Sequence, residues 1–384
     1  VSALMLYSAT RAYAEDTDRA VEFGTRALQK AQRVFGMDSL NAVYTAMYVG
    51  LLANKLKHYV EGESILSDVV ARWRRLGLPR NEVLARCLFH LAKARHKIGK
   101  AAGVETLYRE GIALMRSVGD ESFYKISMGL RGLADFQIEM EKFAEAKAVL
   151  DEAGKISGKV GEDRSEAALT RLLQARWHEE RNEWAEAERT YRSAHAALAK
   201  NADQGATDAE FSRVKLDWSR ALIELGRLDE AATLLAQSKI ALGESSGSND
   251  IASPDFHCIS GELDMANNRF EPAVANLDRG LDLFAKLDVA VPSSEVRCRR
   301  SRVNALLALN RAHDARLEAA KAFTRQQEVN PQAKGELAGL LALRARAEQA
   351  DADPSAAAAS IEQARLLAAP VELLSTADRT TLDL

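Results

Sequence analysis

A helix-turn-helix pattern returns along the whole chain of 384 residues at an interval of about 42 residues. The position at which the second helix of each pair begins carries Ala, Gly or Val in every copy. These positions are Ala20, Gly62, Val104, Ala146, Ala187, Ala231, Ala273, Ala315 and Ala357, at intervals of 42, 42, 42, 41, 44, 42, 42 and 42 residues. Internal repeats of this length are typical of arrays in which each unit packs only against its neighbours. The repeat therefore predicts a helical solenoid that is not divided into separate globular domains.

Two further sets of positions in the same register are also small, in eight of nine places each. The set seven residues later is Ala27, Val69, Gly111, Ala153, Ala194, Ser238, Gly280, Ala322 and Ala364. The set twelve residues earlier is Ser8, Gly50, Ala92, Ala134, Ala175, Ser219, Gly261, Val303 and Ala345. Small side chains at fixed sites on both helices let neighbouring helices approach closely. We call these three sets the packing positions and expect them to be buried between helices.

Within the fourth unit, residues 121–139 are predicted to form the first helix, residues 140–143 a tight turn, and residues 144–156 the second helix, because apolar residues recur there with helical periodicity. Glycine recurs where second helices end, a position at which a left-handed cap favours this residue. These glycines are Gly36, Gly77, Gly119, Gly161, Gly205 and Gly247. The chain has no alternating strand pattern of useful length. We therefore predict an all-α fold.

The register also sets the expected organisation of the chain. The predicted units cover residues 1–36, 37–77, 78–119, 120–161, 162–205, 206–248, 249–290, 291–330 and 331–369, with residues 370–384 as a C-terminal cap or tail. We expect residues 1–384 to form a single solenoid domain. Because the chain begins several residues inside the first helix of its first unit, we expect the natural protein to extend upstream of Val1.

Composition excludes several classes of partner. The chain has 52 basic and 55 acidic side chains, so it has no overall basic surface for direct binding of nucleic acid. The longest nearly uncharged apolar run, residues 42–53, is too short to span a membrane. Cys87, Cys258 and Cys298 show neither zinc-ligand spacing nor the pattern of a disulfide framework. We expect a cytoplasmic protein without cofactor, metal, disulfide or membrane contact.

Motifs of catalysis are missing from the sequence, which has no glycine-rich phosphate loop after a strand, no GxSxG elbow and no HExxH pair. We therefore expect that the protein is not an enzyme. A dense basic cluster, Arg297, Arg299, Arg300 and Arg302, spreads around its predicted helix, and we expect it to be a solvated face that does not bind phosphate.

A recurring turn signature links the sequence to a known family. The signature reads Asn182-Glu183-Trp184-Ala185-Glu186-Ala187, Gly226-Arg227-Leu228-Asp229-Glu230-Ala231 and Glu141-Lys142-Phe143-Ala144-Glu145-Ala146. It resembles tetratricopeptide repeats in their 42-residue form, similar to the repeats of kinesin light chains and of many bacterial regulators. The resemblance implies a right-handed superhelix of about nine units that binds a protein or peptide in its concave groove. It also implies a role within a larger bacterial signalling or transcription-regulatory protein.

The resemblance further implies that first helices line the groove, and the register identifies the residues that face it. The predicted groove residues are Tyr44, Met47, Asn54, Phe89, Lys93, His96, Arg131, Arg176, Arg213 and Arg220. An apolar stretch comes first and a basic stretch follows, which favours an acidic peptide with a hydrophobic anchor, since Met adapts to apolar shapes and Arg grips carboxylates. By the same resemblance, Asn54 would hold the peptide backbone. Alternatively, nearby carboxylates such as Glu139, Glu179 and Glu180 neutralise the arginines in ordinary ion pairs.

Two other functions remain open at this stage. The solenoid could be a sensor of a small molecule or signal peptide that controls an attached output domain. It could instead be an oligomerisation module, with a homodimer formed through exposed apolar residues near Leu366 and Leu373.

Overall fold

The computed structural model describes residues 17–118, 123–160, 165–199, 208–246, 253–286, 292–367 and 369–383. Over these residues the protein is helical, and no strand occurs among them, so the all-α prediction is confirmed. The chain divides into two compact units, Val1–Phe136 with Asp288–Ala290 (unit 1) and Gln137–Leu287 with Val291–Leu384 (unit 2). The sequence predicts one domain, and that prediction remains untested. Each unit is described by itself below.

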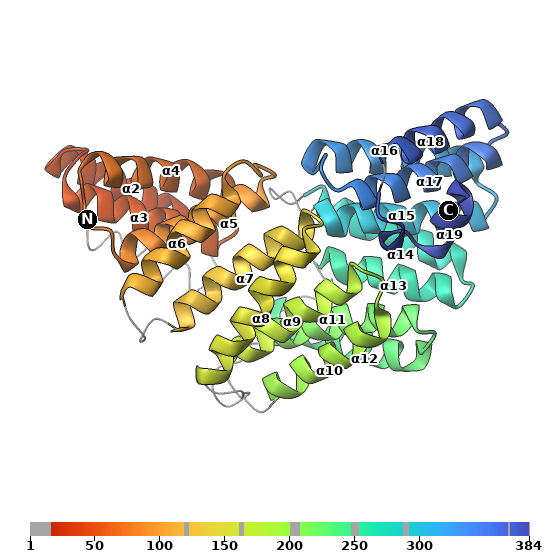
Figure 1. The fold of residues 1–384 in the computed structure, drawn as a ribbon, viewed down its shortest axis with the longest axis horizontal. Helices are drawn as coiled ribbons and strands as arrows, with labels where there is room; N and C mark the ends of the chain where they lie inside the picture. The colour runs from red at the N-terminus through yellow and green to blue at the C-terminus, as the bar shows by residue number, and fades with distance from the viewer. Residues whose placement is uncertain are drawn as a thin grey trace. The chain divides into compact units, whose positions relative to one another are not determined.

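Unit 1 consists of consecutive helices, and each of the first five described helices packs against its neighbour in the chain. They are α2 (Thr17–Phe35), α3 (Leu40–Lys55), α4 (Tyr59–Arg75), α5 (Glu82–Lys97), α6 (Val104–Val118) and the greater part of α7 (Phe123–Glu139). Side-chain caps fix the start of two first helices: Ser39 accepts a hydrogen bond from the backbone of Ala42, and Asn81 caps α5. These helices run from red through orange to golden yellow in Figure 1.

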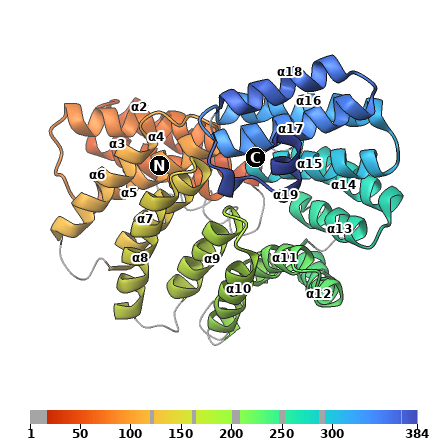
Figure 2. The same cartoon turned by 45° about the vertical axis from the view of Figure 1, so that its right-hand side comes forward.

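Unit 2 continues the helix pairs to the end of the chain. Its helices are α8 (Phe143–Val160), α9 (Ser165–Glu179), α10 (Trp184–Ala199), α11 (Asp208–Glu224), α12 (Leu228–Ser246), α13 (Pro254–Ala266), α14 (Phe270–Phe284), α15 (Pro292–Ala308), α16 (Ala312–Val329), α17 (Lys334–Ala350), α18 (Pro354–Leu366), η3 (Val371–Leu373) and α19 (Thr376–Leu382). Each first helix packs against its own second helix and against the next first helix, as the pairs from α9 to α18 show in Figure 2. The solenoid prediction is therefore confirmed.

The packing positions lie between helices, as predicted. Those of the described residues are buried in every set, with Ala20, Ala146, Ala231 and Ala315 fully inaccessible to solvent. At Gly111 an added Cβ would lie 2.5 Å from the Phe89 ring, and at Gly261 it would lie 2.6 Å from Leu277. The small residues are required because helices touch there.

The backbone repeats in the same register. Among the described residues, the turn after each first helix from α3 to α17 contains a residue in the left-handed conformation, with φ between 56° and 76°: Lys57, Gly99, Glu141, Asn182, Gly226, Asn268, Asn310 and Ala352. This position was not predicted from the sequence. Left-handed glycines were predicted after second helices, and Gly36 and Gly77 confirm them, with φ of 85° and 62°. The other four predicted glycines, at 119, 161, 205 and 247, lie outside the described residues.

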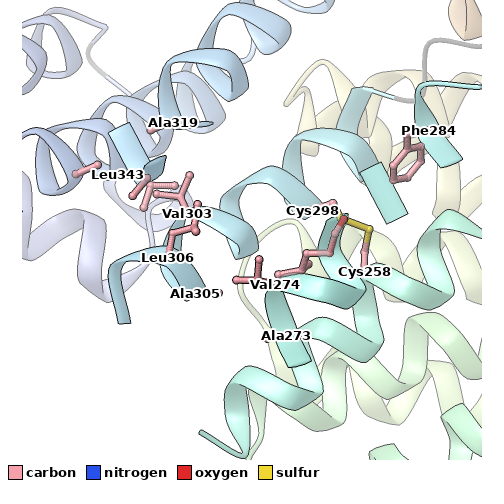
Figure 3. Packing of buried hydrophobic residues seen from close by; sticks show 13 residues of the cluster. Cys258, Ala273, Val274, Phe284, Cys298, Val303, Ala305, Leu306, Ala319 and Leu343 are labelled. Atoms are coloured by element: carbon pink, nitrogen blue, oxygen red, sulfur yellow. A yellow bond between two sulfur atoms is a disulfide. The ribbon is translucent and has the colours of Figure 1, made fainter. Parts of the chain in front are cut away.

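The prediction that the chain has no disulfide was wrong. Cys258 in α13 and Cys298 in α15 form a disulfide, with Cα atoms 5.4 Å apart, inside the cluster of buried apolar side chains in Figure 3. The two cysteines are 40 residues apart in sequence. Residues separated by about one repeat become neighbours when consecutive first helices pack side by side, a relation that cysteine-spacing motifs do not capture.

The C-terminal segment covers the last helix pair. Leu374 and Leu382 are buried in one apolar cluster with Ala338 and Leu341 of α17. This segment shields the apolar face of that helix pair from solvent. Among the described residues, no helix is both long and apolar enough to cross a membrane.

Candidate functional site: the inner face of unit 2

Glu179, at the end of α9, lies at the centre of a group of charged side chains in unit 2. Its carboxylate accepts hydrogen bonds from Arg220 Nη1 at 3.2 Å, from Arg297 Nη1 at 2.7 Å and from the Tyr191 hydroxyl at 2.5 Å. The Glu179 side chain is only 3% exposed. Burial acts to raise the pKa of Glu179, but Arg297 and Arg220 outweigh this effect and hold the pKa below its ordinary value. Glu179 is therefore a buried carboxylate that stays ionised.

Further ion pairs extend this group to other first helices. Arg220 on α11 also bonds Glu262 on α13 at 3.1 Å, and Arg297 on α15 also bonds Glu180 at 2.8 Å. Arg176 bonds Glu139 at 3.1 Å. The inner-face network is defined as Glu139, Arg176, Glu179, Glu180, Arg220, Glu262 and Arg297. The inner face of unit 2 is the side of the first helices on which these side chains meet.

Arg297 shows how strongly unit 2 curves. It joins α15 to α9 although the paired residues are 118 and 117 positions apart in sequence. In a straight stack these helices would not meet, because each unit contacts only its neighbours. The curvature brings their inner faces close enough for a direct ion pair.

Two carboxylates with raised pKa values, Asp217 and Glu224, lie at the margin of this network. Burial raises the pKa of Asp217 to about 6; Arg213 opposes the rise and Glu179 adds to it. Burial also raises the pKa of Glu224, and the carboxylate of Glu262 contributes. On the inner face, Asp217 and Glu224 have raised pKa values, whereas the nearby Glu179 has a lowered one. Carboxylates with such opposite shifts are common at binding sites.

The predicted groove residues of unit 1 have different surroundings. Tyr44 is 36% exposed and its ring meets Trp73 edge-on, with centroids 5.6 Å apart. Met47 and Phe89 are buried in the core, so of the three predicted apolar contacts only Tyr44 faces solvent. The burial of Phe89 could have been inferred from Gly111 in the sequence. Because glycine has no Cβ, it leaves room for the Phe89 ring.

The polar groove residues predicted in unit 1 serve mainly as contacts between helices. Asn54 is buried and its Nδ2 donates to the backbone carbonyl of His90 at 2.7 Å, which joins α3 to α5. His96 is buried against the Phe136 ring, 5.3 Å between centroids. Lys93 is exposed and lies over the Tyr59 ring, 5.9 Å from its centroid.

The basic groove residues divide by environment. Arg176 and Arg220 belong to the inner-face network, while Arg213 is 67% exposed and lies 3.9 Å from Asp217 at its margin. Arg131 in unit 1 donates to Ser127 at 3.0 Å. The structure thus brings Arg176 and Arg220 together, with carboxylates already in place between them. No ligand tests the predicted groove, which remains a prediction.

Sequence reasoning missed the central role of Glu179 and misjudged the arginine cluster on α15. That cluster is not a solvated face, because every member binds carboxylates of neighbouring helices. Besides Arg297, Arg299 bonds Glu318 at 2.5 Å, Arg300 bonds Glu336 at 3.0 Å and Arg302 bonds Asp278 at 2.5 Å. The sequence did contain an indication of these ion pairs. Four arginines that point in different directions around one helix can each reach a different neighbouring helix.

The fold and the inner face define a tetratricopeptide-like helical solenoid. Among solved structures, a Rap protein complexed with competence and sporulation factor is similar at 12% identity, over 96% of this chain and 97% of that chain, with a TM-score of 0.65. The Rap conjugation gene regulator of the plasmid pLS20, in complex with the Phr* peptide, has 11% identity over 85% and 94% of the two chains, with a TM-score of 0.61.

The apo form of the quorum sensor NprR from B. thuringiensis is also similar, with 13% identity over 84% of this chain and 86% of that chain and a TM-score of 0.59. No protein-family model matches the chain, and no curated protein matches its sequence. At these identities the likeness establishes the fold.

Proposed function

We propose that the chain is a peptide-binding regulatory scaffold that holds its ligand on the inner face of its first helices. The inner-face network is the observation that carries this proposal. Burying ionised groups is costly, and apolar side chains of similar volume would pack a solenoid at least as well. A buried group such as Glu179, with partners from α9, α11 and α15, is therefore better explained as a preorganised polar binding surface than as packing.

The similar structures support a peptide as the ligand class. Both Rap structures contain a bound factor or peptide, and NprR is described as a quorum sensor. A long helical solenoid offers an extended inner surface suited to a peptide chain. We propose that this chain has a comparable regulatory role in a larger bacterial signalling or transcription-regulatory protein.

The ligand proposed here is an acidic peptide with a hydrophobic anchor. Its carboxylates would bind Arg213, whose side chain is 67% exposed, and would exchange with protein carboxylates at Arg176. In unit 1, the exposed Lys93 and Tyr44 offer a cation and an aromatic surface. Arg220 contributes by orienting Glu179, because it is itself buried.

Selection from a phage-displayed library of random peptides, followed by calorimetric titration of the selected synthetic peptides, tests the proposal. We expect Arg213→Gln to weaken binding about tenfold or more, since a charge-assisted hydrogen bond is lost. The matched control is Arg189→Gln on α10, a second-helix arginine whose side chain is 65% exposed. Equal affinity of the two variants for every selected peptide would place the ligand elsewhere and contradict the proposal.

Two alternatives give different outcomes. A small-molecule sensor would select no peptides, yet would show a ligand-dependent rise in melting temperature in a metabolite screen. An oligomerisation module would show a concentration-dependent mass in sedimentation; Leu366 on α18 is 76% exposed, whereas Leu374 is buried in the C-terminal cover. We further propose that the chain has no catalytic activity of its own.

A further inference from the structure

The turn between α7 and α8 differs from the equivalent turns of other units. Its left-handed residue is Glu141, with φ of 56°, where Asn182, Asn268 and Asn310 occupy the same register position later in the chain. A left-handed backbone is unfavourable for most residues with a Cβ, and Asn tolerates it better than Glu does. Such a residue persists where its surroundings hold it in place. The side chain of Glu141 supplies the reason.

The Glu141 carboxylate binds the beginning of α17. Its Oε2 accepts a hydrogen bond from the backbone N–H of Gly335 at 2.8 Å, and its Oε1 accepts one from Glu336 at 2.8 Å. The residue before α17 is Ala333, which has no side-chain acceptor for these N–H groups. The first N–H groups of a helix lack partners within the helix and attract a carboxylate. Glu141 therefore caps α17 from a position 194 residues away, and we call this contact the Glu141 cap.

Glycine at position 335 makes this approach possible. An added Cβ there would lie 3.1 Å from Glu141 Oε1 and 2.9 Å from Leu373 Cβ. Both distances are shorter than ordinary contacts of a Cβ atom. A side chain at this position would therefore separate the turn from the helix.

Two more hydrogen bonds connect the same parts of unit 2. Asn330 Nδ2 donates to the backbone carbonyl of Glu139 at 2.5 Å, and Asn182 Nδ2 donates to the carbonyl of Leu373 at 3.4 Å. Each spans 191 residues. The first turns of unit 2 thus contact its last helices, although solenoid units otherwise contact only their neighbours. Unit 2 is closed end to end.

Burial of the Glu141 carboxylate in this contact costs free energy. Burial raises the pKa of Glu141, the N–H groups of Gly335 and Glu336 oppose this rise, and the carboxylates of Glu336 and Glu180 add to it. The carboxylate gives up water and lies near two others of the same charge. Desolvation of the carboxylate therefore offsets part of what its two hydrogen bonds to α17 contribute.

We propose that the Glu141 cap is a releasable closure: while it is made, unit 2 is closed around the inner-face network, and its loss separates the two ends of unit 2 and gives a ligand access to that network. The closure rests on the contacts of Glu141 with the beginning of α17, together with the hydrogen bonds of Asn330 and Asn182. Only its consequence for the ligand rests on the proposed function.

Hydrogen exchange of the full chain, read by mass spectrometry, tests the closure. Glu141→Gly removes the carboxylate and at the same time suits the left-handed backbone, so it does not threaten folding. We expect the amides at the beginning of α17 to exchange about tenfold faster, because they lose a charge-assisted acceptor. Glu141→Gln, which keeps the shape of the side chain and removes its charge, should give a smaller increase at the same amides.

The matched control is Lys57→Gly, at the same register position in unit 1, with φ of 68°. It should leave exchange in α17 unchanged. Unchanged exchange of α17 in both Glu141 variants would overturn the closure, as would faster exchange confined to α7 and α8. Peptides from the library should associate faster with Glu141→Gly than with the unaltered chain, and equal rates would overturn the access step. If no peptide binds any variant, the proposed function fails, while the α17 result still decides the closure.

Discussion

Asp217 and Glu179 are carboxylates of one inner face that differ in proton affinity because of their partners. Two arginines bond Glu179 directly, whereas Arg213 lies 3.9 Å from the Asp217 carboxylate. Burial therefore dominates at Asp217 and raises its pKa to about 6, from an ordinary value of 3.8. The same desolvation cost is offset at Glu179 and left largely uncompensated at Asp217.

This difference predicts how Asp217→Asn changes stability with pH. A raised pKa in the folded chain means that the unfolded chain ionises first, so stability falls as pH rises from about 4 to about 6. The asparagine does not ionise and avoids this loss. We expect the variant to be more stable than the unaltered chain above pH 6, by at most about 3 kcal/mol, and no more stable at pH 4.

Melting temperatures at pH 4 and pH 7.5 check this prediction. Asp151→Asn on α8 is the control, because that aspartate is 51% exposed and pairs with Lys147 one turn away. A gain for Asp217→Asn that is the same at both pH values would contradict the argument.

The predicted groove residues have different surroundings in the two units: Arg176 and Arg220 of unit 2 lie in one network, whereas Met47 and Phe89 of unit 1 are buried in the core. The register placed Arg176 and Arg220 on one face of successive first helices, and the structure finds them in one network. It could not reveal Arg297 as a partner, because the contact between α9 and α15 depends on a small rotation per unit that accumulates along the solenoid. Phe89 was expected to face the groove, but its side chain is buried in the core. On a helix, residues that are adjacent in sequence point in different directions, so a small error in the register exchanges the inner face for the core.

At the scale of the element, the disulfide joins two helices that the solenoid already packs together. Cys258 and Cys298 lie with Val274 and Val303 in the buried cluster of α13 to α17, as Figure 3 shows. The crosslink closes a loop of 40 residues in the unfolded chain. Its stabilisation by restriction of that chain amounts to at most about 4 kcal/mol.

We therefore predict that the double variant Cys258→Ala and Cys298→Ala melts at a lower temperature than the oxidised chain. Reduction with a phosphine should lower the melting temperature of the unaltered chain and leave that of the double variant unchanged. Cys87→Ala is the control: Cys87 is a buried thiol whose pKa is raised to about 12 by burial, so it is unreactive. Identical melting temperatures with and without reductant in the unaltered chain would contradict the prediction.

Helices were the elements most fully predictable from the sequence, and their turns the least. The packing positions give the phase of each helix because only small residues fit where Ala20 or Ala146 is buried. The left-handed residue after each first helix escaped notice because Lys57, Glu141 and Ala352 do not have the residue types that favour it. At Glu141, the contact of the side chain with α17 accompanies this backbone conformation.

On the scale of the whole molecule, units 1 and 2 differ in how their repeats are tied together. The described helices of unit 1 contact helices nearby in the chain. Unit 2 adds contacts that span more than a hundred residues, such as the Arg297 ion pair and the Glu141 cap. Long-range contacts make separate repeats unfold together, whereas neighbour contacts let them unfold singly.

Unit 2 is therefore expected to unfold at a higher urea concentration than unit 1, and over a narrower range. The four tryptophans allow this to be measured, because Trp73 lies in unit 1 and Trp177, Trp184 and Trp218 lie in unit 2. Fluorescence of Trp73→Phe follows unit 2 alone, and the triple Phe variant at the other three positions follows unit 1 alone. Coincident transitions in the two variants would contradict the prediction, since they would mean that the chain unfolds as one cooperative body. Glu141→Gly should broaden the transition of unit 2 and leave that of unit 1 unchanged, because only unit 2 contains the closure.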